Sequence, residues 1–175
     1  MQAPIEIVDY DPLWPQRFTD ERAELLHVIG QWLHGPIEHI GSTAVPGLRA
    51  KPVIDIMAGV ESLPASRDAI PALGRMNYHY WPYKSDVMHW FCKPTAEFRT
   101  HHLHLVPVGS LLWMHRIAFR DRLRADASAR ADYAALKDEL AGRHRHDREA
   151  YTEGKADFIR RIVALQVPQL LRGTD

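Results

Sequence analysis

Residues 41–43, Gly-Ser-Thr, form a small-residue turn of the kind that can bind a phosphate group. Glycine lets the backbone approach a ligand closely, Ser42 and Thr43 add hydroxyl donors, and the free N–H groups of a following helical turn favour an anion. Asp55 follows inside an apolar strand, where its carboxylate could hold a metal ion. The same residues also fit a plain strand-to-loop connection, with Ser42 as a helix cap and Asp55 accepting backbone hydrogen bonds. The residue types therefore suit a nucleotide site without requiring one.

His102 and His104 form a second set of residues that could do chemistry. Side chains two residues apart on a strand project from one face, so both imidazoles can converge on one ligand. The same alternation places Asp55 opposite Ile54 and Ile56, and the three polar side chains face outward together if the two strands share a sheet. Two imidazoles and a carboxylate suit zinc or manganese better than magnesium, which prefers oxygen ligands. The alternatives are that the histidines donate hydrogen bonds to phosphate, or that backbone partners satisfy them.

Cations on the C-terminal helices could also contact a phosphate. Arg116, Arg120 and Arg124 recur every four residues and make one basic ridge on the helix that follows residues 109–110. We expect Arg116 and Arg124 to belong to a solvated face, paired with neighbouring aspartates. Lys155 instead falls on an apolar stripe, where a lysine either extends past its neighbours to water or reaches a buried anion.

The elements that must position these residues change in character near residue 109. Short apolar segments separated by Gly and Pro predict a mixed α/β core over residues 4–108, and longer helical patterns predict a C-terminal helical layer over about 110–172. The core is predicted to contain strands near 4–9, 36–41, 77–81, 87–93 and 101–107, a strand around Asp55, and helices over 14–31 and 64–75. In the layer, one helix is expected to begin behind Ser128, and an apolar stripe from Phe158 to Leu165 precedes Pro168. With no internal repeat or long linker, the 175 residues are predicted to form a single domain.

Residues 38–48 (EHIGSTAVPGL), followed by 51–56 (KPVIDI), resemble the signature of the GrpB family. Further matches occur in the family's order along the chain, at residues 10–15 (YDPLWP), 102–106 (HLHLV), 119–124 (FRDRLR) and 151–159 (YTEGKADFI). GrpB-like proteins are assigned to the polymerase-β-type nucleotidyltransferase superfamily. The resemblance therefore implies a nucleotidyltransferase-like mixed sheet with a helical C-terminal layer, in one GrpB-like domain over residues 1–175.

The resemblance also implies roles for individual residues. Gly41 and Ser42 would hold the phosphates of a nucleotide, with Thr43 beside them, and Asp55 would bind a divalent metal. The cations Lys51, Arg120 and Lys155 would offset the charge that grows on the phosphates during nucleotidyl transfer.

One departure from the superfamily pattern puts that reaction in doubt. The pattern has a second carboxylate two residues after the first, where this chain has Met57, and a thioether is a poor ligand for magnesium. Three functions follow as hypotheses: nucleotidyl transfer with altered metal chemistry, binding of a nucleotide or phosphorylated small molecule without catalysis, and metal-dependent hydrolysis by Asp55, His102 and His104. Some GrpB-like domains are joined to a dephospho-coenzyme A kinase domain, but this chain has no P-loop motif of its own.

Composition narrows the range of partners and compartments. The 22 basic and 22 acidic residues balance, so no global positive field favours a nucleic acid as partner. The single cysteine, Cys92, cannot form an internal disulfide, which agrees with a reducing compartment. The sequence shows neither a signal peptide nor an apolar run approaching ~20 residues, so we expect a cytoplasmic protein that does not enter a membrane.

Overall fold

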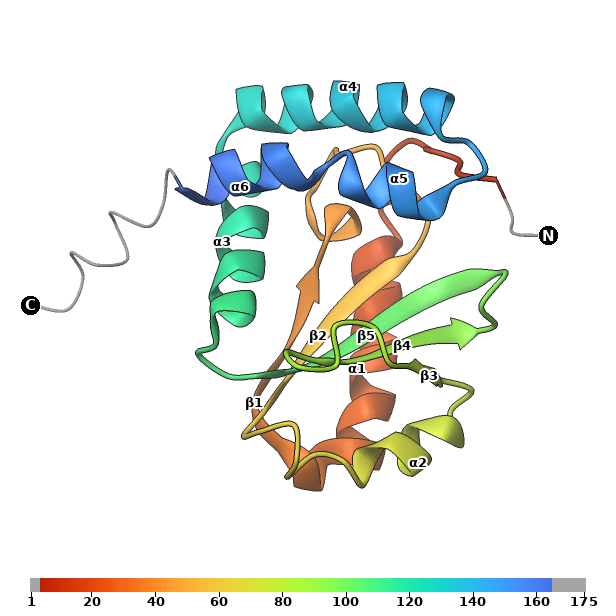
Figure 1. Cartoon of the computed structure of the whole chain (residues 1–175), viewed down its shortest axis with the longest axis vertical. Helices are drawn as coiled ribbons and strands as arrows, with labels where there is room; N and C mark the ends of the chain where they lie inside the picture. Colours follow the sequence, from red (N-terminus) through yellow and green to blue (C-terminus); the bar gives the residue numbers. More distant parts are fainter. Residues whose placement is uncertain (1–3, 165–175) are drawn as a thin grey trace, which may run out of the picture.

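A five-stranded sheet in the order β1-β2-β5-β4-β3 forms the centre of the computed structural model, which describes residues 4–164 (Figure 1). The strands are β1 (Leu33–Ile40), β2 (Ile54–Val60), β3 (His79–Trp81), β4 (His89–Pro94) and β5 (Arg99–Pro107). Neighbouring strands are antiparallel except for the parallel pair β2 and β5. This central parallel pair positions the candidate site, because its register places Asp55 beside His102 and Met57 beside His104.

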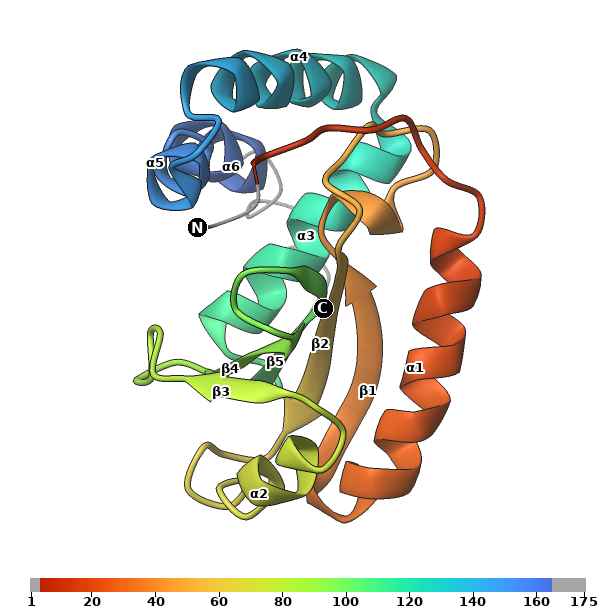
Figure 2. The same cartoon turned by 90° about the vertical axis from the view of Figure 1, so that its right-hand side faces the viewer.

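One face of the sheet is covered by helices α1 (Trp14–Ile29) and α2 (Ala69–Gly74), as Figure 2 shows. A proline in the first turn suits the start of α1, because its missing N–H would have no helical partner there. Trp14, Leu25 and Ile29 are fully buried in the same cluster as the strand residues Ile54, Ile56, Leu103 and Leu105. The expected alternation of β2 and β5 is therefore confirmed, since Ile54, Ile56, Leu103 and Leu105 all face this core.

Helix α3 (Leu111–Ala125) packs on the opposite face of the sheet. It begins at Ser110, whose hydroxyl oxygen accepts a hydrogen bond from the backbone N–H of Trp113. A cluster of β-strand and loop residues is buried beneath it, consisting of Ile40, Met57, Met88 and Val106. The same sheet face carries Asp55, so α3 partly covers the surface on which the candidate site lies.

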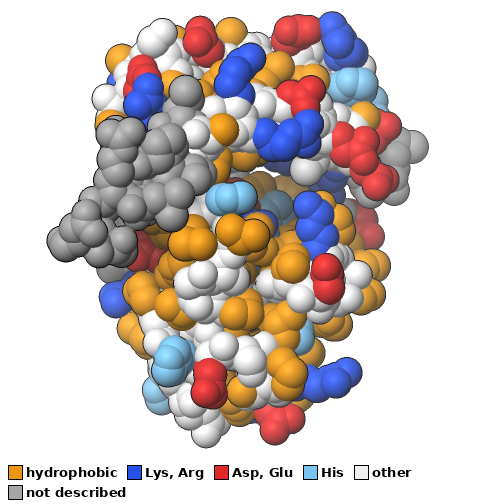
Figure 3. Space-filling view, turned by 60° about the vertical axis from the view of Figure 1, so that its left-hand side comes forward, with side chains coloured by type: hydrophobic (Ala, Val, Ile, Leu, Met, Phe, Trp, Pro, Cys, Tyr) orange, Lys and Arg blue, Asp and Glu red, His pale blue; other side chains and the backbone are white. Residues whose placement is uncertain are grey.

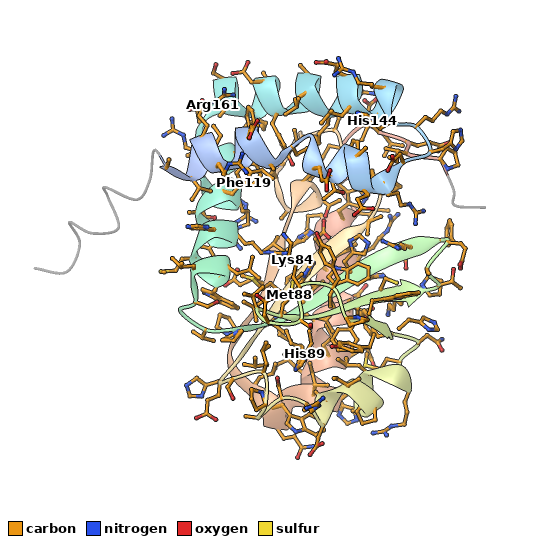
Figure 4. All side chains as sticks on the ribbon, viewed as in Figure 1. Lys84, Met88, His89, Phe119, His144 and Arg161 are labelled. Carbon is orange, nitrogen blue, oxygen red and sulfur yellow. The ribbon has the colours of Figure 1, made fainter. Side chains whose placement is uncertain are left out.

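Helices α4 (Ala127–Arg143), α5 (Arg148–Glu153) and α6 (Ala156–Ala164) form a layer across one end of the sheet (Figure 2). Phe119 of α3 points toward this layer (Figure 4) and makes edge contacts with the rings of Tyr133 and Phe158, which stack on each other. Val45 and Leu48 are buried in the same cluster. The loop that follows the 42–44 turn is thus held against the helical layer.

Several sequence-based expectations for these elements are corrected by the structure. The predicted strand over 4–9 is wrong: this segment makes one isolated bridge, between Val8 and Ala50, and the Ile5 N–H donates to the Arg145 carbonyl in the α4–α5 turn. The helix expected over 64–75 is shortened to α2, because residues before it form turns. The cap of α4 is Asp126 and not Ser128, since the Asp126 carboxylate accepts from two backbone N–H groups of the first turn.

The other expected core elements are confirmed as α1, β1, β2, β3, β4 and β5, and the helical layer is confirmed up to residue 164. Leu165 and Pro168 lie outside the described residues. Within residues 4–164, no helix combines the length and the apolar character that crossing a lipid bilayer demands.

Candidate functional site

The Asp55 carboxylate is the centre of the candidate site. His102 Nδ1 lies 2.8 Å from Asp55 Oδ1 and donates to it, because an ionised carboxylate can only accept. His104 Nε2 lies 3.9 Å from the same oxygen. Burial opposes ionisation of Asp55, yet the hydrogen bond from His102 and the nearby imidazole of His104 hold the pKa of this carboxyl well below its usual range. The expectation that these three side chains share one sheet face is confirmed.

Gly41 brings the small-residue turn into direct contact with this carboxylate. Its backbone has φ 71° and ψ −172°, a conformation that is essentially restricted to glycine. A Cβ atom at this position would lie 2.4 Å from Asp55 Oδ2. The two motifs that the sequence singled out therefore meet at one point, and Ser42 begins the short 3₁₀ helix η2 (Ser42–Ala44) beside it.

Lys51 and Lys155 approach the site from two different elements and both contact Tyr151. Their Nζ atoms lie 4.8 Å and 4.2 Å from the centre of the Tyr151 ring. Burial lowers the pKa of Lys155 to about 7, the charge of Lys51 acts in the same direction, and Asp55 acts in the opposite one. Burial also lowers the pKa of Lys51. Within residues 4–164, neither ammonium group has a carboxylate at ion-pair distance.

Arg116 belongs to this site, and sequence reasoning misplaced it. Its expected exposed position beside an aspartate is wrong: it is partly buried, its Nη2 contacts Met88 Sδ at 3.8 Å, and no acidic side chain in the described part of the chain pairs with it. Burial lowers its pKa, whereas Asp55 acts to raise it. The sequence feature that could have placed Arg116 correctly is its position next to Ile117, on the face of α3 that packs on the sheet. In contrast, Arg124 is half exposed and lies 3.7 Å from Asp121, as expected.

Tyr133 and Tyr151 are two further residues whose place near Asp55 was not predicted. Burial raises the pKa of both hydroxyls, and the negative charge of Asp55 raises both further. The two side chains come from α4 and α5. The C-terminal layer thus contributes to the surroundings of Asp55 as well as to the packing.

Thr43 and Arg120 are used for internal contacts in this structure. The Thr43 side chain is 1% exposed, and its hydroxyl donates to the Val53 carbonyl at 3.3 Å and pairs with an imidazole nitrogen of His39 at 2.9 Å. Arg120 Nη1 donates to Glu38 Oε2 at 2.6 Å and to the carbonyl of His39 at 3.1 Å. Both side chains stabilise the end of β1 and so support the turn.

The residues proposed as metal ligands come together without forming a three-ligand set. Among the residues that the structure describes, no group of three or more His, Cys, Asp and Glu side chains is arranged to hold one metal ion. Asp55 is instead bonded directly to His102, while the Nε2 atoms of His102 and His104 are buried without a hydrogen-bond partner. Met57, at the position of the superfamily's second carboxylate, is fully buried in an apolar cluster. The side chains present do not fit two-metal catalysis.

A pocket of about 190 Å³ adjoins the site on the side of α5. Its apolar wall consists of Pro4, Ile5, Pro52, Val53 and Phe98, and its polar lining consists of Glu6, Lys51, Glu97, Arg99, His102 and Arg148. Figure 3 shows that the surface is also hollowed beneath the helical layer, where histidine and basic side chains gather. The site is therefore bordered by open space and by positive charge.

The buried imidazole of His104 predicts a specific acid sensitivity. Burial and the nearby Arg116 lower the pKa of His104 to about 3, although Asp55 acts to raise it. Below about pH 6.5 the unfolded chain binds a proton at this residue and the folded chain does not. The contribution of His104 to the free energy of unfolding is therefore unaffected by pH above that value and becomes unfavourable below it. Between pH 7.5 and pH 5.0 we expect the free energy of unfolding to fall about 1–2 kcal/mol more in the native protein than in His104→Asn. Equal losses in urea titrations of both proteins would contradict this role.

The fold and the site define an α+β protein with one mixed sheet and an acid–histidine pair bordered by lysines. The chain belongs to the GrpB family: the family profile described as GrpB protein matches residues 4–165. A UPF0157 protein of Pseudomonas aeruginosa is 37% identical over 163 residues, which are 91% of this chain and 66% of that protein. The glutamate-rich protein GrpB of Alkalihalophilus pseudofirmus is 33% identical over 164 residues, covering 90% of this chain and 92% of that one.

Two further comparisons concern structure and a longer relative. The crystal structure of conserved protein GrpB from Enterococcus faecalis matches with a TM-score of 0.85 and 28% identity, covering 95% of this chain and 100% of that one. A dephospho-CoA kinase of Mycolicibacterium paratuberculosis is 28% identical over a gapped alignment of 184 positions that covers 91% of this chain and 45% of that protein. This chain thus spans less than half of that kinase and about two thirds of the Pseudomonas relative.

Proposed function

We propose that this GrpB-family protein binds a nucleotide or another phosphorylated small molecule, with a phosphate group held between Lys51 and Lys155 next to the Gly41–Ser42 turn. The observation that carries the proposal is the pair of lysines, which are partly buried against Tyr151 with no carboxylate at ion-pair distance in residues 4–164. Burying a charge is costly unless it is paired. A bound anion would provide the missing partner.

The charges around the site favour a bound anion over a bound cation. Asp55 acts on Lys51, Lys155 and Arg116 alike, and His102 already donates to its carboxylate. Three cations around one hydrogen-bonded carboxylate leave an excess of positive charge. An ammonium group binds phosphate as a compact charge, and backbone N–H groups of a glycine-containing turn can add donors.

Binding is the function that the geometry supports best, and the nucleotidyltransferase superfamily provides the fold-level analogy. We propose no nucleotidyl transfer through two metal ions, because the residue that would supply the second carboxylate is Met57. The mycobacterial relative is named dephospho-CoA kinase, and a kinase transfers a phosphate group. That activity agrees with a phosphorylated ligand and specifies none.

Replacing Lys155 should weaken binding of phosphorylated ligands and change its pH dependence. We expect Lys155→Met to reduce the affinity for the best ligand about ten-fold or more, because a charge-assisted hydrogen bond contributes roughly 1.5–3 kcal/mol. The pKa of Lys155 is about 7, so lowering the pH from 8.5 to 7 raises its protonated fraction to about half and should strengthen binding in the native protein more than in the variant. Thermal-shift screening of nucleotides, followed by calorimetric titration, measures both effects.

A matched control is Lys84→Met, which removes the same charge from an exposed position in the β3–β4 loop (Figure 4). It should leave the affinity unchanged. If Lys155→Met and Lys84→Met bind alike, or if no phosphorylated ligand shifts the melting temperature of the native protein, the proposed site is wrong.

A further inference from the structure

The pocket beside the site contains a second pair of cations that the proposed function does not use. Arg148 at the start of α5 donates from Nη1 to the Ala96 carbonyl at 2.9 Å and from Nη2 to the Glu97 carbonyl at 2.7 Å. Arg99 at the start of β5 donates from Nε to the same Ala96 carbonyl at 2.9 Å. Both guanidinium groups are thus positioned by one turn, the connection between β4 and β5.

These arginines retain donors that the turn does not use. A guanidinium group has five N–H donors, and the contacts with the turn engage only part of them. Glu6 and Glu97 also line the pocket, but within residues 4–164 neither carboxylate lies at ion-pair distance from Arg99 or Arg148. The pocket therefore has cationic groups available to a ligand.

Lys51 connects this pair to the first site. It lines the pocket, and it also contacts the Tyr151 ring whose other neighbour is Lys155. Burial lowers the pKa of Lys51, and the positive charges of Arg148 and Arg99 lower it further. Lys51 therefore lies near Lys155 across the Tyr151 ring and also near Arg99 and Arg148 in the pocket.

We propose that the pocket is a second anion subsite, and that the ligand carries at least two phosphate groups, one between Lys51 and Lys155 and another against Arg99 and Arg148. The inference rests on the proposed function. Guanidinium groups suit phosphate because their planar donors match pairs of phosphate oxygens. A polyphosphate chain places successive charges along one molecule, so it can engage both cation pairs at once, and its second contact then forms within the bound complex.

Calorimetric titrations with inorganic phosphate, pyrophosphate and tripolyphosphate test this proposal. In the native protein we expect tripolyphosphate to bind at least ten-fold more tightly than phosphate. Arg148→Gln and Arg99→Gln should each lower the tripolyphosphate affinity about ten-fold and leave the phosphate affinity within two-fold. Arg99→Lys, which keeps the charge, should recover part of the loss.

The control is Arg145→Gln, which removes an exposed positive charge close to Arg148 in sequence but outside the pocket lining. It should bind tripolyphosphate as the native protein does. Melting temperatures of all variants show whether the turn remains folded, and Arg99→Gln keeps the test valid if Arg148→Gln does not fold.

The possible failures separate the two proposals. Equal affinities for phosphate and tripolyphosphate, or arginine variants that match the native protein, would overturn the second subsite and leave the first site intact. Binding of two independent phosphate ions, with no gain for tripolyphosphate, would also overturn the single polyphosphate ligand. If neither anion binds the native protein, the proposed function itself is wrong.

Discussion

Met57→Asp is expected to lower the free energy of unfolding by about 4 kcal/mol or more, and not to create a metal site. The superfamily pattern has a carboxylate at this position, which makes the substitution an obvious attempt to restore two-metal chemistry. Met57 is fully buried, however, in the cluster of Ile40, Met88 and Val106 beneath α3. The variant would lose the packing of the methionine and bury a carboxylate among apolar side chains.

Urea denaturation measures this effect, and Met57→Leu is its matched control. A leucine conserves the volume and the apolar character, so its cost should stay below about 1.5 kcal/mol. If Met57→Asp is as stable as Met57→Leu and takes up a divalent metal ion in elemental analysis, the strand has room for a second ligand that the present packing does not indicate.

Gly41→Ala is expected to be the most damaging small substitution at the site. Its φ of 71° with ψ of −172° costs a residue with a Cβ of the order of 1–3 kcal/mol before any contact is considered. The new Cβ would in addition lie 2.4 Å from Asp55 Oδ2, so the carboxylate or the turn must move. We expect a loss of stability of about 3 kcal/mol or more, together with loss of phosphate binding.

Gly47→Ala separates backbone strain from the clash. Gly47 has a similar φ of 76°, but a Cβ there meets no atom within 4 Å. Its variant should lose about 1–2 kcal/mol and retain phosphate binding. Denaturation and phosphate titration of both variants make the comparison, and equal effects on binding would show that the contact between Gly41 and Asp55 does not matter to the site.

The contacts of Thr43 and Arg120 explain how residues inside a family signature can affect the site by holding the backbone that forms it. Thr43 bonds to the Val53 carbonyl just before β2, and Arg120 holds the carbonyl of His39 near the end of β1. Each contact fixes backbone on one side of the Gly41 turn. Such residues stabilise the approach of the turn to Asp55 through contacts within the protein.

Local patterning by itself determined the fold class and the facing of the central strands. Ile54 and Ile56 alternate with Asp55, and Leu103 alternates with His102 and His104. Successive side chains of a strand point to opposite faces of the sheet, and the apolar ones must be buried. Once one residue of a strand is known to face the core, the face of every other residue in that strand is therefore known. The sheet face shared by the acid and the histidines therefore followed from the sequence, whereas the burial of His104 on that face did not.

The remaining features of the site depended on which distant segments pack together. Only the tertiary structure showed that Lys51 and Lys155 meet across one tyrosine ring, since they belong to a loop and to the α5–α6 junction. Equal spacing on α3 could not show that Arg116 lies toward Asp55 while Arg120 pairs with Glu38. These contacts join residues far apart in the chain, and they are set by the docking of helices on the sheet, for which a local pattern carries no information.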